Sequence, residues 1–175
     1  LIILLHFNFS PHSYQFKPFI GSSHFWAISK LTGIDVNKRV LDVGPGSCAI
    51  GAWLKDNGVN FLTAVDIDPV ARERAKPIYS RVEESIEPLK SERFDLILLL
   101  DVVEHLPRPA EFLKAVGELL APGGEILISV PNFIHWSVRF PMLFGFLPEA
   151  ERGILDKTHL QTFTRKRLRK LIGSV

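Results

Sequence analysis

The chain has 175 residues, of which 46% are hydrophobic, which is enough for one substantial core and falls within the usual size of a single domain. Its formal net charge of +2 arises from 21 basic and 19 acidic residues, a balance that excludes a molecule-wide attraction to nucleic acid. One cysteine, Cys48, excludes an internal disulfide and a multi-cysteine metal site, so we expect a cytoplasmic protein.

The first residues, 1–5, form an apolar run much shorter than the roughly 20 residues that cross a bilayer. It also lacks the flanks of a signal peptide, and no transmembrane segment is predicted. Because the chain does not begin with Met and stops just after a helical pattern at Val175, we expect that one or both ends are missing.

Short apolar runs alternate with helical patterns along the chain, which predicts a mostly parallel sheet wrapped in helices. We expect five strands, and the predicted ranges are 39–43, 61–65, 78–82, 94–100 and 125–130. The predicted helices cover 47–57, 69–76, 109–120 and 165–172, with the turn Ala121-Pro122-Gly123-Gly124 ending the third and Thr164 capping the last. The segment 133–147 is aromatic but broken by Pro141 and Gly145, so it is interpreted as a lid or packing arm.

These elements give a three-layer Rossmann-like α/β sandwich. Within one domain we expect an N-terminal arm and cover helix over 1–38, a ligand-binding core over 39–132 and an acceptor-side segment over 133–175.

Glycines at the turn after the first predicted strand, in Asp42-Val43-Gly44-Pro45-Gly46-Ser47, permit a ligand to approach the backbone closely. Asp66 ends the second strand roughly 20 residues later, where a carboxylate can accept the hydroxyls of a ribose. The same glycines fit a dinucleotide fingerprint, so an NAD-dependent oxidoreductase is the rival hypothesis. Asp42 argues against that rival, because it would repel a pyrophosphate but could orient the turn or reach a cationic amino group.

Five ordered motifs resemble those of class I S-adenosylmethionine-dependent methyltransferases: Asp42–Gly46, Val65–Pro69, Phe94–Ile97, Asp101–Leu106 and Leu120–Gly124. More narrowly, Ser129–Asn132, His135–Arg139, Gly153–Leu160 and Phe163-Thr164 resemble the methyltransferase 23-like domains, a bacterial branch often associated with polysaccharide and glycosyl-transfer systems. The resemblance implies S-adenosylmethionine as cofactor and a small-molecule or glycan acceptor. It places the methionine part at Asp42, Gly44, Pro45 and Gly46, the ribose on Asp66, the adenine against Ile67, and the methyl-bearing sulfur near Asp101 and Val102.

The chain departs from the family pattern twice. Cys48 replaces a usual third glycine, and the Gly-Asp pair expected after the third strand aligns with Ser80-Arg81, which removes the usual acidic partner of the adenine amine. The second departure supports an alternative hypothesis, a methyltransferase fold that binds the cofactor without turnover. The family's sheet also continues with two further strands, and this sequence ends before them. Strand 125–130 is therefore expected to form an open edge that favours self-association.

Histidine is the usual base near neutral pH, and His135 and His159 fall in the segment expected to cover the acceptor. They are the predicted catalytic residues. The pair Glu104-His105 is interpreted as structural, because adjacent helical positions diverge and the sequence reveals no third ligand. We therefore predict no metal site and transfer without a divalent ion. The basic run Arg165–Lys170 is interpreted as a solvated helix face, with no strong indication of nucleic-acid binding.

Overall fold

The computed structural model describes residues 22–146 and 154–175, so residues 1–21 of the predicted N-terminal arm and cover helix (1–38) lie outside the described residues. The described strands are β1 (Arg39–Val43), β2 (Phe61–Val65), β3 (Arg81–Glu83), β4 (Phe94–Leu100) and β5 (Leu120–Ser129). The α-helices are α1 (Ser23–Leu31), α2 (Ala49–Asp56), α3 (Pro69–Ala75), α4 (Pro109–Gly117), α5 (Trp136–Leu143) and α6 (Arg165–Ile172). Two 3₁₀ helices, η1 (Glu87–Leu89) and η2 (Val103–His105), lie between them. No helix in the described ranges is long and apolar enough to cross a membrane.

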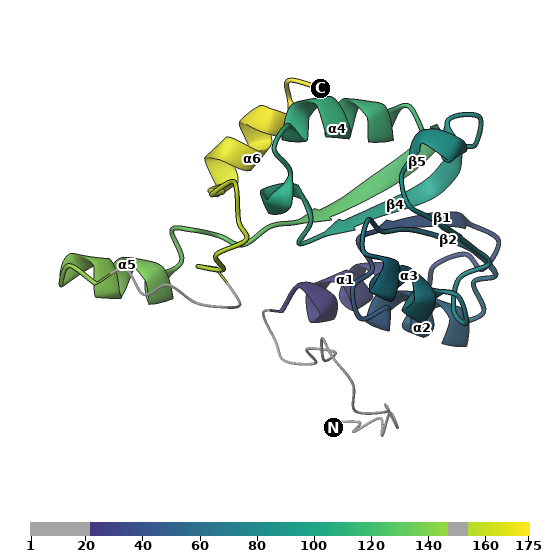
Figure 1. Cartoon of the computed structure of the whole chain (residues 1–175), viewed down its shortest axis with the longest axis horizontal. Helices are drawn as coiled ribbons and strands as arrows, with labels where there is room; N and C mark the ends of the chain where they lie inside the picture. Colours follow the sequence, from purple (N-terminus) through teal and green to yellow (C-terminus); the bar gives the residue numbers. More distant parts are fainter. Residues whose placement is uncertain (1–21, 147–153) are drawn as a thin grey trace.

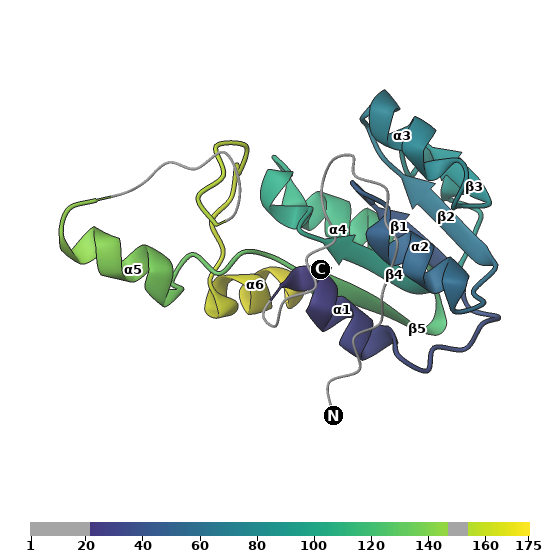
Figure 2. The ribbon, with the colours of Figure 1, turned by 90° about the horizontal axis from the view of Figure 1, so that it is seen from below.

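The five strands form one sheet in the order β3-β2-β1-β4-β5, and every pair is parallel. Helices α1, α2 and α3 cover one face, while α4 and α6 cover the other (Figures 1 and 2). The predicted three-layer sandwich is confirmed. Its central strand β4 is almost wholly apolar because both of its faces are covered.

Each face of the sheet has its own core. On one face Leu54 of α2 and Ala27 of α1 pack against Val40 and Leu98, and on the other Leu113 and Val116 of α4 pack among residues such as Leu41, Ile97 and Leu99. Side chains alternate between faces along each strand, so residues 96 and 98 face one core while 97 and 99 face the other. Strands β1, β2 and β4 and helix α6 begin and end where the sequence predicted.

Three predicted elements are corrected. Strand β3 lies at Arg81–Glu83, three residues after the predicted start, because residues 78–80 still belong to the turn that follows α3. Strand β5 starts at Leu120 rather than 125, so the turn expected to end a helix forms an irregular start of the strand, with a register shift opposite Phe94 and Leu96. A Cβ on Gly124 would lie 2.9 Å from the carbonyl oxygen of Phe94, so glycine permits this close pairing.

The third correction concerns 133–147, which contains helix α5 despite Pro141 within it. The helix ends two residues after Pro141, and Gly145 at φ 77° follows. Figures 1 and 2 show α5 projecting from the body of the molecule. At its base, Asn132 forms a bridge with Phe163, and the Phe133 amide donates to the Phe163 carbonyl at 2.8 Å. The chain therefore leaves and re-enters the body of the molecule at neighbouring points.

Candidate functional site

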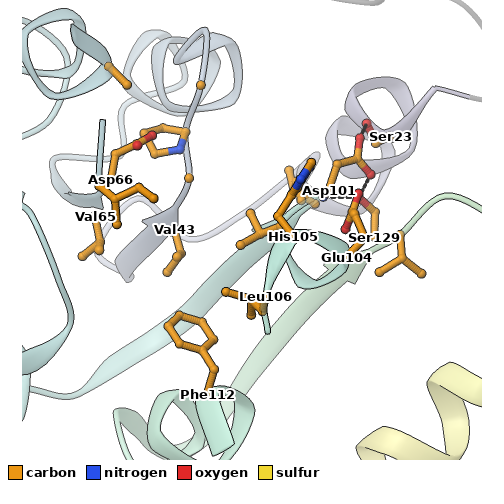
Figure 3. Close-up of a pocket in the computed structure, with 18 of the residues that line it drawn as sticks. Ser23, Val43, Val65, Asp66, Asp101, Glu104, His105, Leu106, Phe112 and Ser129 are labelled. Carbon is orange, nitrogen blue, oxygen red and sulfur yellow. Dashed lines mark hydrogen bonds between the residues drawn. The ribbon is translucent and has the colours of Figure 1, made fainter. Parts of the chain in front are cut away.

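A cavity of about 1200 Å³ opens at the carboxyl ends of β1, β2, β4 and β5 (Figure 3). The strand order reverses between β1 and β4, and ligands of open α/β sheets bind at such a switch point. All predicted site residues but Asp42 line it: Gly44, Pro45, Gly46, Asp66, Ile67, Asp101, Val102, His135 and His159. The fold therefore brings together residues from five separate stretches of sequence.

The turn after β1 requires its glycines. Gly44 and Gly46 have φ angles of 65° and 51°, which L side chains rarely adopt. A Cβ on Gly44 would lie 2.9 Å from Val102 Cγ2, so the turn packs directly against the second residue after β4. Cys48 also has a positive φ, of 60°, and its side chain is fully buried. Burial raises the pKa of its thiol to about 12, which fits a small packing residue rather than a nucleophile.

Asp42 lies beneath this turn and does not line the cavity. It is 4% exposed, and its Oδ2 accepts a hydrogen bond of 2.5 Å from the Tyr79 hydroxyl. Burial raises the pKa of Asp42 to about 6, against the lowering effect of this hydrogen bond. Of the two roles suggested for Asp42 by the sequence, this geometry fits orientation of the turn. Tyr79 is a residue that sequence reasoning missed.

Next to the glycine turn, the end of β2 and helix α3 form a wall of the cavity. Asp66 Oδ1 accepts a hydrogen bond from the Asp68 amide at 2.9 Å, which fixes the carboxylate at the end of the strand. Beside it, the side chain of Ile67 is 84% exposed, so it offers an apolar surface that a flat ring of a ligand can contact. Arg74 Nη1 donates to the Gly46 carbonyl at 2.8 Å and so ties α3 to the glycine turn. No sequence motif pointed to Arg74.

The corrected position of β3 changes one conclusion from the sequence. Because β3 ends at Glu83, the residues that follow it are Glu84 and Ser85, and both line the cavity. An acidic side chain is thus present where the alignment with Ser80-Arg81 predicted none. The Glu83 carbonyl accepts from the Asp66 amide at 3.1 Å, so the ends of β2 and β3 are held together.

Asp101 joins three elements on the far side of the cavity from Asp66 (Figure 3). Its Oδ2 accepts from the Ser23 hydroxyl of α1 at 2.6 Å, and its Oδ1 accepts from the Ser129 hydroxyl of β5 at 2.7 Å. Its φ of 55° turns the chain sharply after β4. Both oxygens are thereby engaged, so Asp101 serves as a fixed anchor in the cavity wall.

The two predicted catalytic histidines have different surroundings. His135 is exposed and caps α5, with its Nδ1 2.8 Å from the Ser137 hydroxyl. His159 is largely buried, and its Nδ1 lies 3.3 Å from the Ile154 carbonyl. Because a carbonyl accepts hydrogen bonds, this Nδ1 carries the proton, and Nε2 carries the lone pair.

The lone-pair nitrogen of His159 faces Glu104, with Nε2 3.9 Å from Oε1. Glu104 is 1% exposed, and neither of its carboxylate oxygens has a hydrogen-bond partner among the described residues. Burial raises the pKa of Glu104 to about 8. One ligand atom of Glu104, one of His105 and one of His159 all lie within 4.8 Å of each other. The structure therefore supplies the third side chain that the Glu104-His105 pair lacked in the sequence.

The sequence and the fold are both similar to those of known methyltransferases. A model of the methyltransferase domain family matches residues 25–174. Curated relatives include ubiquinone biosynthesis O-methyltransferases from Azotobacter vinelandii, 34% identical over 54% of this chain and 45% of that protein, and from Xylella fastidiosa, 36% identical over 54% and 42%. The chain spans about half the length of the curated relatives it matches.

Among solved structures, an S-adenosylmethionine-dependent methyltransferase from Archaeoglobus fulgidus superimposes with a TM-score of 0.66 at 22% identity, covering 87% of this chain and 68% of that one. Magnesium protoporphyrin IX methyltransferase from Synechocystis, solved with S-adenosylhomocysteine bound, gives 0.64 at 14% identity, covering 85% and 69%. These likenesses concern the fold, and they match the arrangement predicted from the five motifs. The chain belongs to the methyltransferase domain family and has the Rossmann-like fold of class I S-adenosylmethionine-dependent methyltransferases.

Proposed function

We propose that the chain binds S-adenosylmethionine in the cavity and transfers its methyl group to a hydroxyl of a small acceptor. The observation that carries this proposal is the cavity at the switch point, with an open glycine turn on one strand end and Asp66 on the next. Asp66 and Glu84 offer acceptors for hydroxyl and amino groups, and the exposed Ile67 offers an apolar surface for a purine. Family membership favours this proposal over a nicotinamide cofactor.

The half of the cavity beyond β4 is suited to the acceptor. Apolar side chains of Leu106, Phe112 and Ile154 line it, together with His135 and His159. The relatives from Azotobacter and Xylella are named as O-methyltransferases of ubiquinone biosynthesis, which supports an oxygen acceptor. We propose a hydroxylated aromatic or other small apolar molecule. Of the two acceptor classes expected from the sequence, a small molecule or a glycan, the apolar lining favours the small molecule.

The chain's main contribution to the reaction is alignment. The bound cofactor supplies an electrophilic methyl group, and the acceptor oxygen attacks it in a single displacement. Holding the two in line can provide much of the rate acceleration. The acceptor hydroxyl must also lose its proton. His159 is better placed than His135 to receive it. Nδ1 of His135 accepts the hydrogen bond that caps α5, which leaves the ring proton on Nε2, whereas Nε2 of His159 keeps its lone pair.

Cofactor binding is tested by calorimetry with S-adenosylmethionine, S-adenosylhomocysteine and NADH. We expect both sulfur compounds to bind, and Asp66→Ala to weaken their binding by about 1.5 to 3 kcal/mol because it removes charged hydrogen bonds to the ribose. Asp56→Ala removes an exposed carboxylate at the far end of α2 and is the matched control. Tight NADH binding without any response to the sulfur compounds would refute the proposal.

The proton-accepting role is tested by single-turnover methylation at saturating cofactor, after screening phenols, other small alcohols and sugars as acceptors. His159→Ala should lower the rate by about 10²-fold or more while leaving cofactor affinity unchanged. His135→Ala should have a much smaller effect. Equal rates in the parent and both variants would refute a proton-accepting role for either histidine, and the reaction would then depend on alignment alone.

The alternative hypothesis is a binding module without turnover. It predicts cofactor binding of ordinary affinity and no methyl transfer to any screened acceptor. The presence of Glu84 after β3 removes one of the observations that supported it.

A further inference from the structure

Glu104, His105 and His159 form a cluster in which a buried carboxylate has no hydrogen-bond partner among the described residues. A carboxylate removed from water is unfavourable unless a hydrogen bond, an ion or a proton compensates it. Glu104 is 1% exposed, and neither Oε1 nor Oε2 has a hydrogen-bond partner among the described residues. The nearest basic atom recorded for it, His159 Nε2, lies at 3.9 Å, beyond hydrogen-bond range.

Backbone carbonyl groups orient both histidines of the cluster. His159 Nδ1 donates to the Ile154 carbonyl at 3.3 Å, and His105 Nδ1 lies 3.2 Å from the Thr158 carbonyl. Each ring therefore keeps the lone pair on its Nε2. Metal-binding histidines commonly donate their other ring nitrogen to a carbonyl in this way.

The segments that carry the cluster are fixed to each other by their backbones. The Glu104 carbonyl accepts from the amides of Leu160 and Gln161, each at 2.9 Å. The rings of His105 and His159 meet edge to face with their centroids 4.9 Å apart. The two segments are thus fixed to each other by the fold, with Glu104 buried, His159 largely buried and His105 exposed at the cavity.

We propose that Glu104, His105 and His159 bind a divalent transition-metal ion such as Zn²⁺ at the acceptor side of the cavity. Metal–nitrogen and metal–oxygen bonds of about 2.0 to 2.2 Å place two ligand atoms about 3 to 4 Å apart. The spacing of 3.9 Å between Glu104 Oε1 and His159 Nε2 falls in that range. Two imidazoles and one carboxylate favour zinc or a neighbouring transition metal over magnesium, which prefers oxygen ligands.

The role of this ion rests on the proposed function. All three residues line the cavity, so an ion held by them would be accessible to an acceptor bound there. An acceptor hydroxyl on the ion would lose its proton to solvent more readily. Its oxygen then forms the new bond to carbon while the carbon–sulfur bond breaks and the sulfonium becomes a thioether. His159 would act as a ligand instead of a base, and the predicted metal-free transfer would be wrong.

Metal binding is measured without turnover, by titrating ZnCl₂ into the chelator-treated full chain in a calorimeter. We expect one site of micromolar or tighter affinity, weakened at least about 100-fold in Glu104→Gln and in His159→Ala, because each removes a ligand. His135→Ala alters a cavity histidine outside the cluster and should leave the affinity unchanged. Thermal melting of Glu104→Gln, which keeps the shape of the side chain, establishes that the variant is folded.

Absence of saturable zinc binding in the parent chain would overturn the inference, and so would equal affinity in the parent and Glu104→Gln. Binding of S-adenosylhomocysteine is measured on the same samples. If the chain binds S-adenosylhomocysteine but not zinc, the proposed function stands and the metal site is refuted. If it binds zinc but not S-adenosylhomocysteine, the metal site stands and the proposed function is refuted.

Discussion

At the scale of single residues, the buried pair of Asp42 and Tyr79 makes stability depend on pH. Asp42 has a pKa of about 6 in the folded protein because burial disfavours its charge, against a usual value of 3.8. Between these values the folded chain holds a proton that the unfolded chain has lost. The free energy of unfolding contributed by Asp42 is therefore greatest below about pH 4 and decreases by about 3 kcal/mol as pH rises through 6.

Asp42→Asn should abolish this dependence, since its amide oxygen can still accept from Tyr79 and carries no charge. Urea denaturation at several pH values compares the parent with Asp42→Asn, and the difference between their free energies of unfolding should change by about 2 kcal/mol from pH 4 to pH 7. Asp56→Asn, at an exposed carboxylate, should run parallel to the parent. Parallel profiles for all three proteins would contradict the assignment.

At the scale of elements, the contact between α2 and the turn after α3 depends on Gly51. A Cβ there would lie 2.1 Å from the Tyr79 hydroxyl oxygen, so Gly51→Ala must displace the tyrosine from Asp42. We expect a loss of about 1 to 3 kcal/mol in the free energy of unfolding, measured by urea denaturation. In α4, a Cβ on Gly117 would meet no described atom within 4 Å beyond its chain neighbours and the backbone of its own helix, so Gly117→Ala should instead stabilise the chain by up to about 1 kcal/mol. Equal effects of the two substitutions would refute this explanation.

Local sequence patterns predicted the elements whose burial is uniform. Strand β4 is an unbroken apolar run because both cores need it, and Thr164 caps α6 by accepting from the Arg167 amide. Strand β3 was misplaced because Arg81–Glu83 has three residues, two of them charged, and lies at the sheet edge without an apolar run. Helix α5 was missed because Pro141 lies inside it and because its start depends on a histidine cap rather than on apolar periodicity.

The site also contains residues that local sequence patterns could predict and residues that they could not. Gly44, Gly46 and Asp66 follow strands that the sequence reveals, so their meeting at one sheet edge could be predicted. The approach of His159 to Glu104 could not, because it depends on the path of the chain between β5 and α6. The hydrogen bond from Tyr79 to Asp42 likewise joins residues that share no local pattern.

At the scale of the whole molecule, β5 has no strand partner on its outer side within the described residues. A groove of about 800 Å³ lies beside it, lined by Ile126, Ile128, Leu168 and Ile172 among others. We expect this chain to self-associate through the open edge, with a mass by light scattering that rises with concentration. Ile172→Asp places a charge in the groove and should shift the chain toward monomer. Trp136→Ala removes an exposed aromatic side chain from α5, outside the groove, and should not. A constant monomer mass at all concentrations would contradict the prediction.

The bridge between Asn132 and Phe163 has a consequence for how such a molecule can diversify. The polypeptide between these two residues departs and returns at almost one point, so a change in its length alters the entropic cost of closing it only slightly. It contributes His135, Ile154, Asp156 and His159 to the cavity, while the glycine turn, Asp66 and Glu84 come from the sheet. Substitutions or insertions in the part of this stretch before residue 154 are therefore expected to change the side of the cavity proposed for the acceptor. The side proposed for the methyl donor, which is built from the turns after the strands, should stay the same.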